Sequence, residues 1–227
     1  MGCTLHCRLG ASEEEVFIMS NIYNEVLDKI IYLYEGYSKE HRACTQPFHL
    51  QKVKAAVKDY QYDCDDILIR EPLIEHSGSL PMVATTIYPH IKDKSVDLGE
   101  ALIMLAIHDI GELVVGDEMV FTKQDDNGLE KAAALKLLPT IYHDLYLDME
   151  EQRTNTGKFA KSIDKITPDV VDLMTPAEVT LDRYSKQVGD ESPVTLLKMH
   201  KHPHMLWNDF MKNLHLELMT RLEEKLT

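Results

Sequence analysis

The sequence predicts an all-α protein, because it is poor in turn-forming residues and rich in long amphipathic segments. Gly and Pro supply 10 and 9 of the 227 residues, which is about 8% against roughly 12% in average proteins. Apolar residues make up 44% of the chain, enough to build a core, and no strand pattern of convincing length is present. We therefore expect a single α-helical domain over residues 1–227, with its core at about 66–190.

The N-terminal part is predicted to be a helical extension over residues 12–64. Ser12 precedes three glutamates, as an N-cap residue does, and Gly36 lies near the end of an apolar pattern that runs to about Tyr37. A second helix of this extension is expected after Pro47.

A third helix is expected around His76, which lies in the middle of an apolar face. At about 100° per residue, one stripe of this helix holds His76, Leu80, Val83, Ala84, Ile87 and Ile91. Pro81 should kink the helix, because it lacks the amide that would bond back to Ser77. A single histidine on such a face is more often a satisfied core residue than a ligand, so His76 alone decides nothing.

Further helices follow along the chain. Residues 98–115 form one, and its segment 101–107 is apolar on every face, which is typical of a helix buried all round. Others are expected at about 129–138, after Pro139, from Asn155 or Thr156 onward, and as a C-terminal helix at about 204–226. Pro168 and Pro176 indicate that the stretch after Asn155 is not uniformly helical.

Four polar groups lie on helices that are otherwise built for burial: His76, His108, Asp109 and Asp164. Asp109 follows the apolar segment almost directly, and a buried carboxylate without a partner is costly, so it is normally paired or bound to metal. Two imidazoles and two carboxylates suit a divalent ion such as manganese, cobalt, iron, nickel or zinc, with magnesium as a further candidate. Four such ligands leave coordination positions of the ion open for water and a phosphate oxygen.

These residues and their surroundings resemble the HD-domain metal-dependent phosphohydrolases. The family signature is a His, then a His-Asp pair, then a distant Asp, all on helices of one bundle. Here it reads Glu75-His76-Ser77, then His108-Asp109-Ile110-Gly111-Glu112 continuing to Gly116-Asp117, then Lys158-Phe159-Ala160-Lys161-Ser162-Ile163-Asp164-Lys165. The resemblance covers about Arg70 to Val179 and is greatest to the compact subgroup of 5′-deoxynucleotidases and small deoxynucleoside triphosphohydrolases.

The resemblance implies a role for each matching residue. The metal ligands would be His76, His108, Asp109 and Asp164. Glu112 would act with a water in proton transfer, and Asp117 would orient the nucleophile or interact with the leaving group. Lys123 and Lys161 would bind phosphate, and Arg70 is a weaker substrate-binding candidate because it lies near His76 in sequence. The alternatives are an exposed carboxylate in the last turn of its helix for Glu112, a turn residue after Gly116 for Asp117, and plain solvated side chains for the two lysines.

Two departures limit what the resemblance implies. Nucleotide-specific members carry a basic-aromatic pair upstream of the first His, whereas the one Trp of this chain, Trp207, lies in the last helix, so base and sugar preference stay open. Members with two metals need extra histidines before the last Asp, and only His143 is available, so we expect a single metal. The run His200-Lys201-His202-Pro203-His204 fits a loop that caps a helix better than a metal site.

The predicted function is metal-dependent hydrolysis of (deoxy)nucleoside 5′-phosphates, as by a 5′-nucleotidase. Hydrolysis of deoxynucleoside triphosphates is the alternative within the same fold. The alternative from another class is a catalytically silent regulatory or scaffolding protein that has kept the helical bundle and uses its terminal helices to bind partners.

The net charge of the chain limits the kinds of partner that it is expected to bind. Its 24 Lys and Arg against 38 Asp and Glu give a net charge of −14, which argues against polymeric nucleic acid but not against a small nucleotide, because a bound metal reverses the field locally. No stretch approaches about 18 apolar residues, so no membrane partner is expected. Four cysteines without a signal-type apolar region favour a reduced cytoplasmic protein, and we expect a homodimer.

Overall fold

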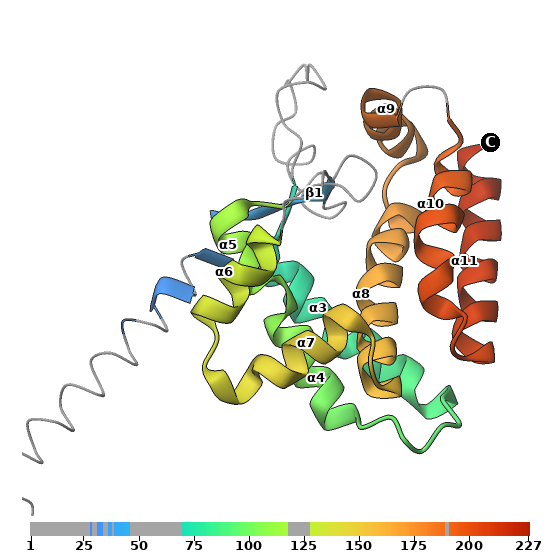
Figure 1. The fold of residues 1–227 in the computed structure, drawn as a ribbon. Helices are drawn as coiled ribbons and strands as arrows, with labels where there is room; N and C mark the ends of the chain where they lie inside the picture. Colours follow the sequence, from blue (N-terminus) through green and yellow to red (C-terminus); the bar gives the residue numbers. More distant parts are fainter. Residues whose placement is uncertain are drawn as a thin grey trace, which may run out of the picture.

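The computed structural model describes residues 70–117, 128–188 and 191–227, together with residues 28, 31–33, 36–37 and 39–45. Helices dominate these parts of the chain (Figure 1), which confirms the all-α prediction. Most of the extension expected over residues 12–64, including the helix expected after Pro47, lies outside the described residues.

Two short strands precede a series of helices and 3₁₀ turns. The elements are β1 (His41–Thr45), β2 (Arg70–Pro72), α3 (Leu73–Ile87), η1 (Tyr88–His90), α4 (Leu98–Ile107), η2 (His108–Gly111), α5 (Glu112–Val115), α6 (Leu129–Leu137), η3 (Thr140–Tyr142), α7 (His143–Glu151), α8 (Asn155–Met174), α9 (Ala177–Val188), α10 (Pro193–Lys201), η4 (His202–Met205) and α11 (Asp209–Leu226). The helices predicted after Gly128 and from Asn155 are confirmed by α6 and α8.

The helix α8 is the centre of the bundle, because it packs against α3, α4, α7 and α11. Phe159, Ile163 and Ile166 of α8 belong to the main apolar cluster, which also draws on α3, α4 and the C-terminal helices. Figure 1 shows α8, α10 and α11 running side by side on one flank of the bundle, with α4 and α7 on the other side of α8.

The apolar stripe around His76 is confirmed, since His76, Leu80, Ala84 and Ile87 are all buried in α3. The helix continues through Pro81 to its end at Ile87. His76 therefore lies in the first turn of α3, on the face of the helix that is buried.

The prediction that the stretch after Asn155 is not uniformly helical is confirmed at Pro176, which lies between the end of α8 at Met174 and the start of α9 at Ala177. It is wrong at Pro168, because α8 runs through this proline without interruption. Proline costs a helix one backbone hydrogen bond, but its fixed φ is compatible with the helix. Packing of α8 against helices on several sides outweighs that loss.

The segment 101–107 is not buried all round, contrary to the prediction. Only Ala101, Met104 and Leu105 of α4 are buried, and Ile103 is 40% exposed. The reason is that α4 packs on α3, α7 and α8 from one side and leaves its other side at the surface. The single helix expected over residues 98–115 is also divided, because the chain tightens into the 3₁₀ turn η2 after Ile107.

The strands β1 and β2 pair antiparallel and were not predicted, because three to five residues are too few to show a strand pattern. Their pairing brings His41 opposite Pro72, and the amide of Leu73 donates to the carbonyl of Glu40 at 3.0 Å. The strand β1 also packs against α3 and α8. The N-terminal part is thus attached beside the start of the helix that carries His76.

The C-terminal helix begins later than expected, at Asp209, because residues 202–205 form the 3₁₀ turn η4. The side chain of Asn208 caps α11 by accepting hydrogen bonds from the amides of Phe210 and Met211. Within the described parts of the chain, none of the helices has the length and apolar character needed to cross a bilayer.

Candidate metal centre

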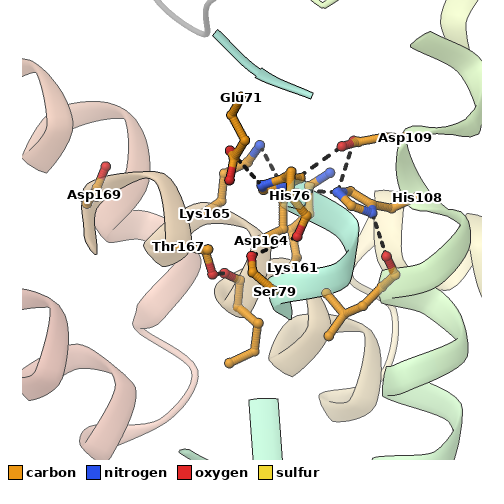
Figure 2. A network of polar contacts seen from close by, with 12 residues as sticks. Glu71, His76, Ser79, His108, Asp109, Lys161, Asp164, Lys165, Thr167 and Asp169 are labelled. Atoms are coloured by element: carbon orange, nitrogen blue, oxygen red, sulfur yellow. Dashed lines mark hydrogen bonds and ion pairs between the residues drawn. The ribbon is translucent and has the colours of Figure 1, made fainter. Parts of the chain in front are cut away.

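Three elements that are distant in sequence bring four polar side chains together in the core. His76 comes from α3, His108 and Asp109 from η2, and Asp164 from α8. Each of them is buried, with at most 5% of its surface exposed. Figure 2 shows the side chains directed toward one another at the meeting point of these elements.

The distances within this group are short. Asp164 Oδ1 lies 3.5 Å from His76 Nε2 and 3.4 Å from His108 Nε2. The ligand atoms of these three residues all lie within 4.8 Å of one another. Asp109 borders them, because its Oδ1 lies 2.9 Å from His108 Nε2 and its Oδ2 lies 3.7 Å from His76 Nε2.

Both imidazoles turn Nε2 toward the group. The Nδ1–H of His108 donates to the carbonyl of Leu105 at 2.9 Å, since a carbonyl can only accept. This fixes the tautomer that keeps a lone pair on Nε2. On His76, Nδ1 faces Glu71 Oε2 at 3.6 Å, so this carboxylate lies on the side of the ring away from the group.

The carboxylates of the group favour a positive charge beside them. Burial lowers the pKa of His108, but the carboxylates of Asp109 and Asp164 outweigh it and raise the pKa to about 10. Burial raises the pKa of Asp164, but the Lys165 ammonium and the imidazole of His108 hold it well below its usual range. In the absence of another cation, a proton on an imidazole is what balances these carboxylates.

The residues present fit a divalent metal ion. Among the described residues, neither ring nitrogen of His76 nor Nε2 of His108 has a hydrogen-bond partner, which is unusual for buried polar atoms. Ligands about 2.1 Å from one ion lie about 3.0 to 3.4 Å apart in octahedral or tetrahedral arrangements. The separations of 3.4 and 3.5 Å from Asp164 Oδ1 are close to these values.

The 3₁₀ turn η2 presents His108 and Asp109 to the group, and Gly111 allows it to do so. A Cβ atom at Gly111 would lie 2.4 Å from the carbonyl oxygen of Glu130, so only glycine lets η2 approach α6 this closely. A short 3₁₀ segment within a helical stretch often marks a functional position. Here it turns two consecutive side chains into the core.

The two predicted catalytic carboxylates are placed differently. Glu112 is buried at the start of α5, one turn after His108. Asp117 is half-buried beyond α5, after Gly116, whose positive φ of 81° ends the helix where the sequence predicted a break. Burial, together with the charges of Asp109 and Glu112, raises the pKa of Tyr37. The N-terminal part therefore reaches the edge of the centre.

The predicted phosphate-binding residues are only partly brought to the group. Lys161 lies on α8, and its ammonium contacts Glu150 Oε1 at 2.7 Å. Burial alone would lower the pKa of Lys161, but the carboxylates of Glu150 and Asp164 raise it. Lys123 lies outside the described residues, and of Arg70 only the backbone, at the start of β2, is described.

Two residues beside the centre were missed from sequence. Glu71 is buried in β2 and faces His76, and Lys165 contacts Asp164 Oδ2 at 3.1 Å. An acidic residue five positions before His76 was a weak signal for Glu71. Lys165 was visible in the motif, but nothing in the sequence distinguished it from Lys161.

The histidines near residue 200 do not join the centre. The ring of His202 contacts that of His215, with their Nδ1 atoms 3.1 Å apart, and His204 Nδ1 lies 3.1 Å from the side-chain oxygen of Gln152. Within the described residues, the one group of side chains spaced to hold a metal is that of His76, His108 and Asp164.

The fold and the site define a class of protein. It is a helical bundle in which separate elements supply a buried His, a His-Asp pair and an Asp to one site. Residues 64–186 match the HD-domain family, which is more than half of the chain. The chain therefore belongs to the HD-domain family. No match was found among curated proteins.

Solved structures with the same fold include one from Magnetospirillum magnetotacticum that is described as a predicted metal-dependent phosphohydrolase. It is 19% identical, covers 95% of each chain and gives a TM-score of 0.63. A conserved hypothetical protein from Pyrococcus furiosus is 18% identical over 86% of this chain and 99% of its own, with a TM-score of 0.54. A protein from Pyrococcus horikoshii is 15% identical over 87% and 98%, with a TM-score of 0.53.

Proposed function

We propose that the protein is a metal-dependent phosphohydrolase. One observation carries the proposal: two imidazoles with Nε2 directed inward and the carboxylate of Asp164 converge in a buried group whose ligand atoms lie within 4.8 Å. Membership of the HD-domain family and the likeness to the Magnetospirillum protein support it.

The residues have distinct parts in such a reaction. His76, His108, Asp109 and Asp164 would hold a divalent ion, which would supply Lewis acidity for a phosphoryl oxygen and lower the pKa of the attacking water. Glu112, buried one turn after His108, accepts the proton of the attacking water. Asp117 orients the nucleophile or interacts with the leaving group. Burial of the whole group strengthens each of these electrostatic contacts.

The proposed substrates are (deoxy)nucleoside 5′-monophosphates, and deoxynucleoside triphosphates are the alternative. The basis is the motif around His108 and Asp164, which resembles the compact 5′-deoxynucleotidase subgroup. Lys161 and Lys123 are proposed to offset phosphate charge, and Arg70 to contact the remainder of the nucleotide. The net charge of −14 favours a small nucleotide over a nucleic-acid polymer. A cytoplasmic homodimer is part of the same proposal.

A silent scaffold is the rival from another class. The energetic cost of the site argues against a scaffold, because a scaffold gains nothing from burying Asp109, Asp164 and Glu112 beside two imidazoles. The Nε2 atoms of these imidazoles lack hydrogen-bond partners among the described residues.

The test is metal analysis of the purified protein, followed by phosphate release from nucleoside mono-, di- and triphosphates. We expect a divalent metal near one per chain, turnover of at least one nucleotide class, and loss of both in Asp109→Ala. The matched control is Asp144→Ala, which removes an exposed carboxylate of α7 and should keep both. Unchanged metal content and turnover in Asp109→Ala would refute the proposal. Metal-free protein that stays inactive with added manganese, cobalt or zinc would favour the scaffold.

A further inference from the structure

The two carboxylate oxygens of Asp164 contact different kinds of partner. Its Oδ1 faces the imidazoles of His76 and His108 at 3.5 and 3.4 Å, whereas its Oδ2 contacts the Lys165 ammonium at 3.1 Å. Figure 2 shows Lys165 on the same side of Asp164 as His76 and Glu71. The lysine therefore lies at the rim of the candidate metal centre, next to one of its ligands.

Lys165 and Lys161 are engaged differently although they are one turn apart on α8. The Lys161 side chain is 13% exposed and its charge is matched by Glu150 at 2.7 Å. The Lys165 side chain is 26% exposed, and among the described residues its one ion-pair partner is the metal-facing Asp164. An ammonium has three N–H donors, so Lys165 can keep Asp164 and still donate to an incoming oxyanion.

The negative charge around the centre favours a cationic side chain at the position of Lys165. Glu71, Asp109, Glu112 and Asp164 are all buried carboxylates around the two imidazoles. A divalent ion offsets only part of their formal charge, so a phosphate group that approaches the ion still meets excess negative charge. A lysine at the rim lowers this barrier, and among the described residues the one carboxylate that Lys165 contacts is the metal-facing Asp164.

We propose that Lys165 donates hydrogen bonds to the phosphoryl oxygens of the substrate and is thus a substrate-contacting residue of the centre. The inference rests on the proposed phosphohydrolase function and deepens it by naming the lysine that binds the reacting phosphate. Its contact with Asp164 Oδ2 holds the ammonium at the position where that phosphate arrives.

The experiment separates metal binding from phosphate binding. Wild type, Lys165→Met and Lys165→Arg are titrated with the divalent ion, among Mn²⁺, Co²⁺ and Zn²⁺, that wild type binds most tightly, and the saturated proteins are then titrated with inorganic phosphate. Lys198→Met is the matched control, because Lys198 of α10 pairs with Glu223 at 3.6 Å at the surface. Circular dichroism checks that each variant is folded.

We expect Lys165→Met to weaken phosphate binding about tenfold or more, the size of one charge-assisted hydrogen bond, while metal affinity changes less than about threefold. Lys165→Arg should retain most of the phosphate affinity, and Lys198→Met all of it.

Equal phosphate affinity in Lys165→Met and wild type at saturating metal would overturn the inference and leave the phosphohydrolase proposal intact. A loss of metal affinity alone would give Lys165 a purely positioning role and overturn it as well. Metal-loaded wild type that binds no phosphate and releases none from nucleotides would instead refute the proposed function, and the inference with it.

Discussion

Replacing Glu71 by glutamine tests whether the carboxylate behind His76 contributes to the metal centre. Glu71 is buried in β2, and its Oε2 lies 3.6 Å from His76 Nδ1, on the side of the ring opposite the ligand group. A carboxylate in this position orients a ligand histidine and increases the basicity of its other nitrogen. Glutamine keeps the size of the side chain and removes the charge.

The expected magnitude follows from the geometry. Loss of such a partner reduces metal affinity by about 10- to 100-fold, which is about 1.4 to 2.7 kcal/mol. The contact of 3.6 Å is longer than a direct hydrogen bond, so we expect the lower end, about tenfold. Burial of both side chains means that no bulk water takes the place of the lost charge.

The assay is calorimetric titration of metal-free wild type, Glu71→Gln and Glu75→Gln with the same divalent ion. Glu75 is the next acidic residue along the chain, in the first turn of α3, and its amide variant should bind metal as wild type does. A Glu71→Gln protein that is folded and binds metal within about threefold of wild type would show that the carboxylate does not support His76.

Substitutions at two glycines and at His215 are expected to change the free energy of unfolding. Gly111→Ala should lower the free energy of unfolding by about 1 to 3 kcal/mol, because its Cβ would lie 2.4 Å from the Glu130 carbonyl oxygen. Gly78→Ala, in open space on α3, should raise it by up to about 1 kcal/mol, and the opposite ranking in urea unfolding would contradict the packing argument. Burial and nearby positive charge lower the pKa of His215 to about 4, so its contribution is present above about pH 6.5 and is lost as the pH falls toward 4. Between about pH 7.5 and 5, wild type should therefore lose about 2 kcal/mol more than His215→Gln. Asp169 Oδ2 lies 3.8 Å from His215 Nε2, and the raised pKa of Asp169, about 6, adds stability as the pH falls, which opposes the loss at His215 in wild type. Equal pH slopes in the two proteins would refute the assignment to His215.

The positions of His76 and Asp109 in the core were predictable because burial leaves a periodic trace in sequence. His76 shares one helical stripe with the apolar residues that bury it, and Asp109 follows an apolar run. Periodicity does not reveal which side of a helix meets a neighbour. It therefore failed for Ile103, which is as apolar as its neighbours in α4 but lies at the surface.

The contacts that complete the site were not predictable, because they depend on pairings that are distant in sequence or on side-chain direction. Glu71 reaches His76 because β2 pairs with β1, far upstream in the N-terminal part. Lys161 and Lys165 have similar surroundings in sequence, and only the structure shows that Glu150 neutralises one while the other contacts Asp164.

The helix α8 shows why a buried aspartate does not by itself indicate a metal. It carries Asp164, Asp169 and Asp172, and all of them are buried. Asp169 pairs with Lys201, and Asp172 pairs with Arg183 at 2.6 Å, so cations of the protein itself balance both at buried positions. Asp164 also contacts a cation of the protein, because the Lys165 ammonium lies 3.1 Å from its Oδ2, but its other oxygen, Oδ1, faces the Nε2 atoms of two imidazoles. A carboxylate oxygen that lies beside two imidazole nitrogens can bind one cation from outside the chain together with them, and this distinguishes the metal centre from the structural ion pairs on the same helix.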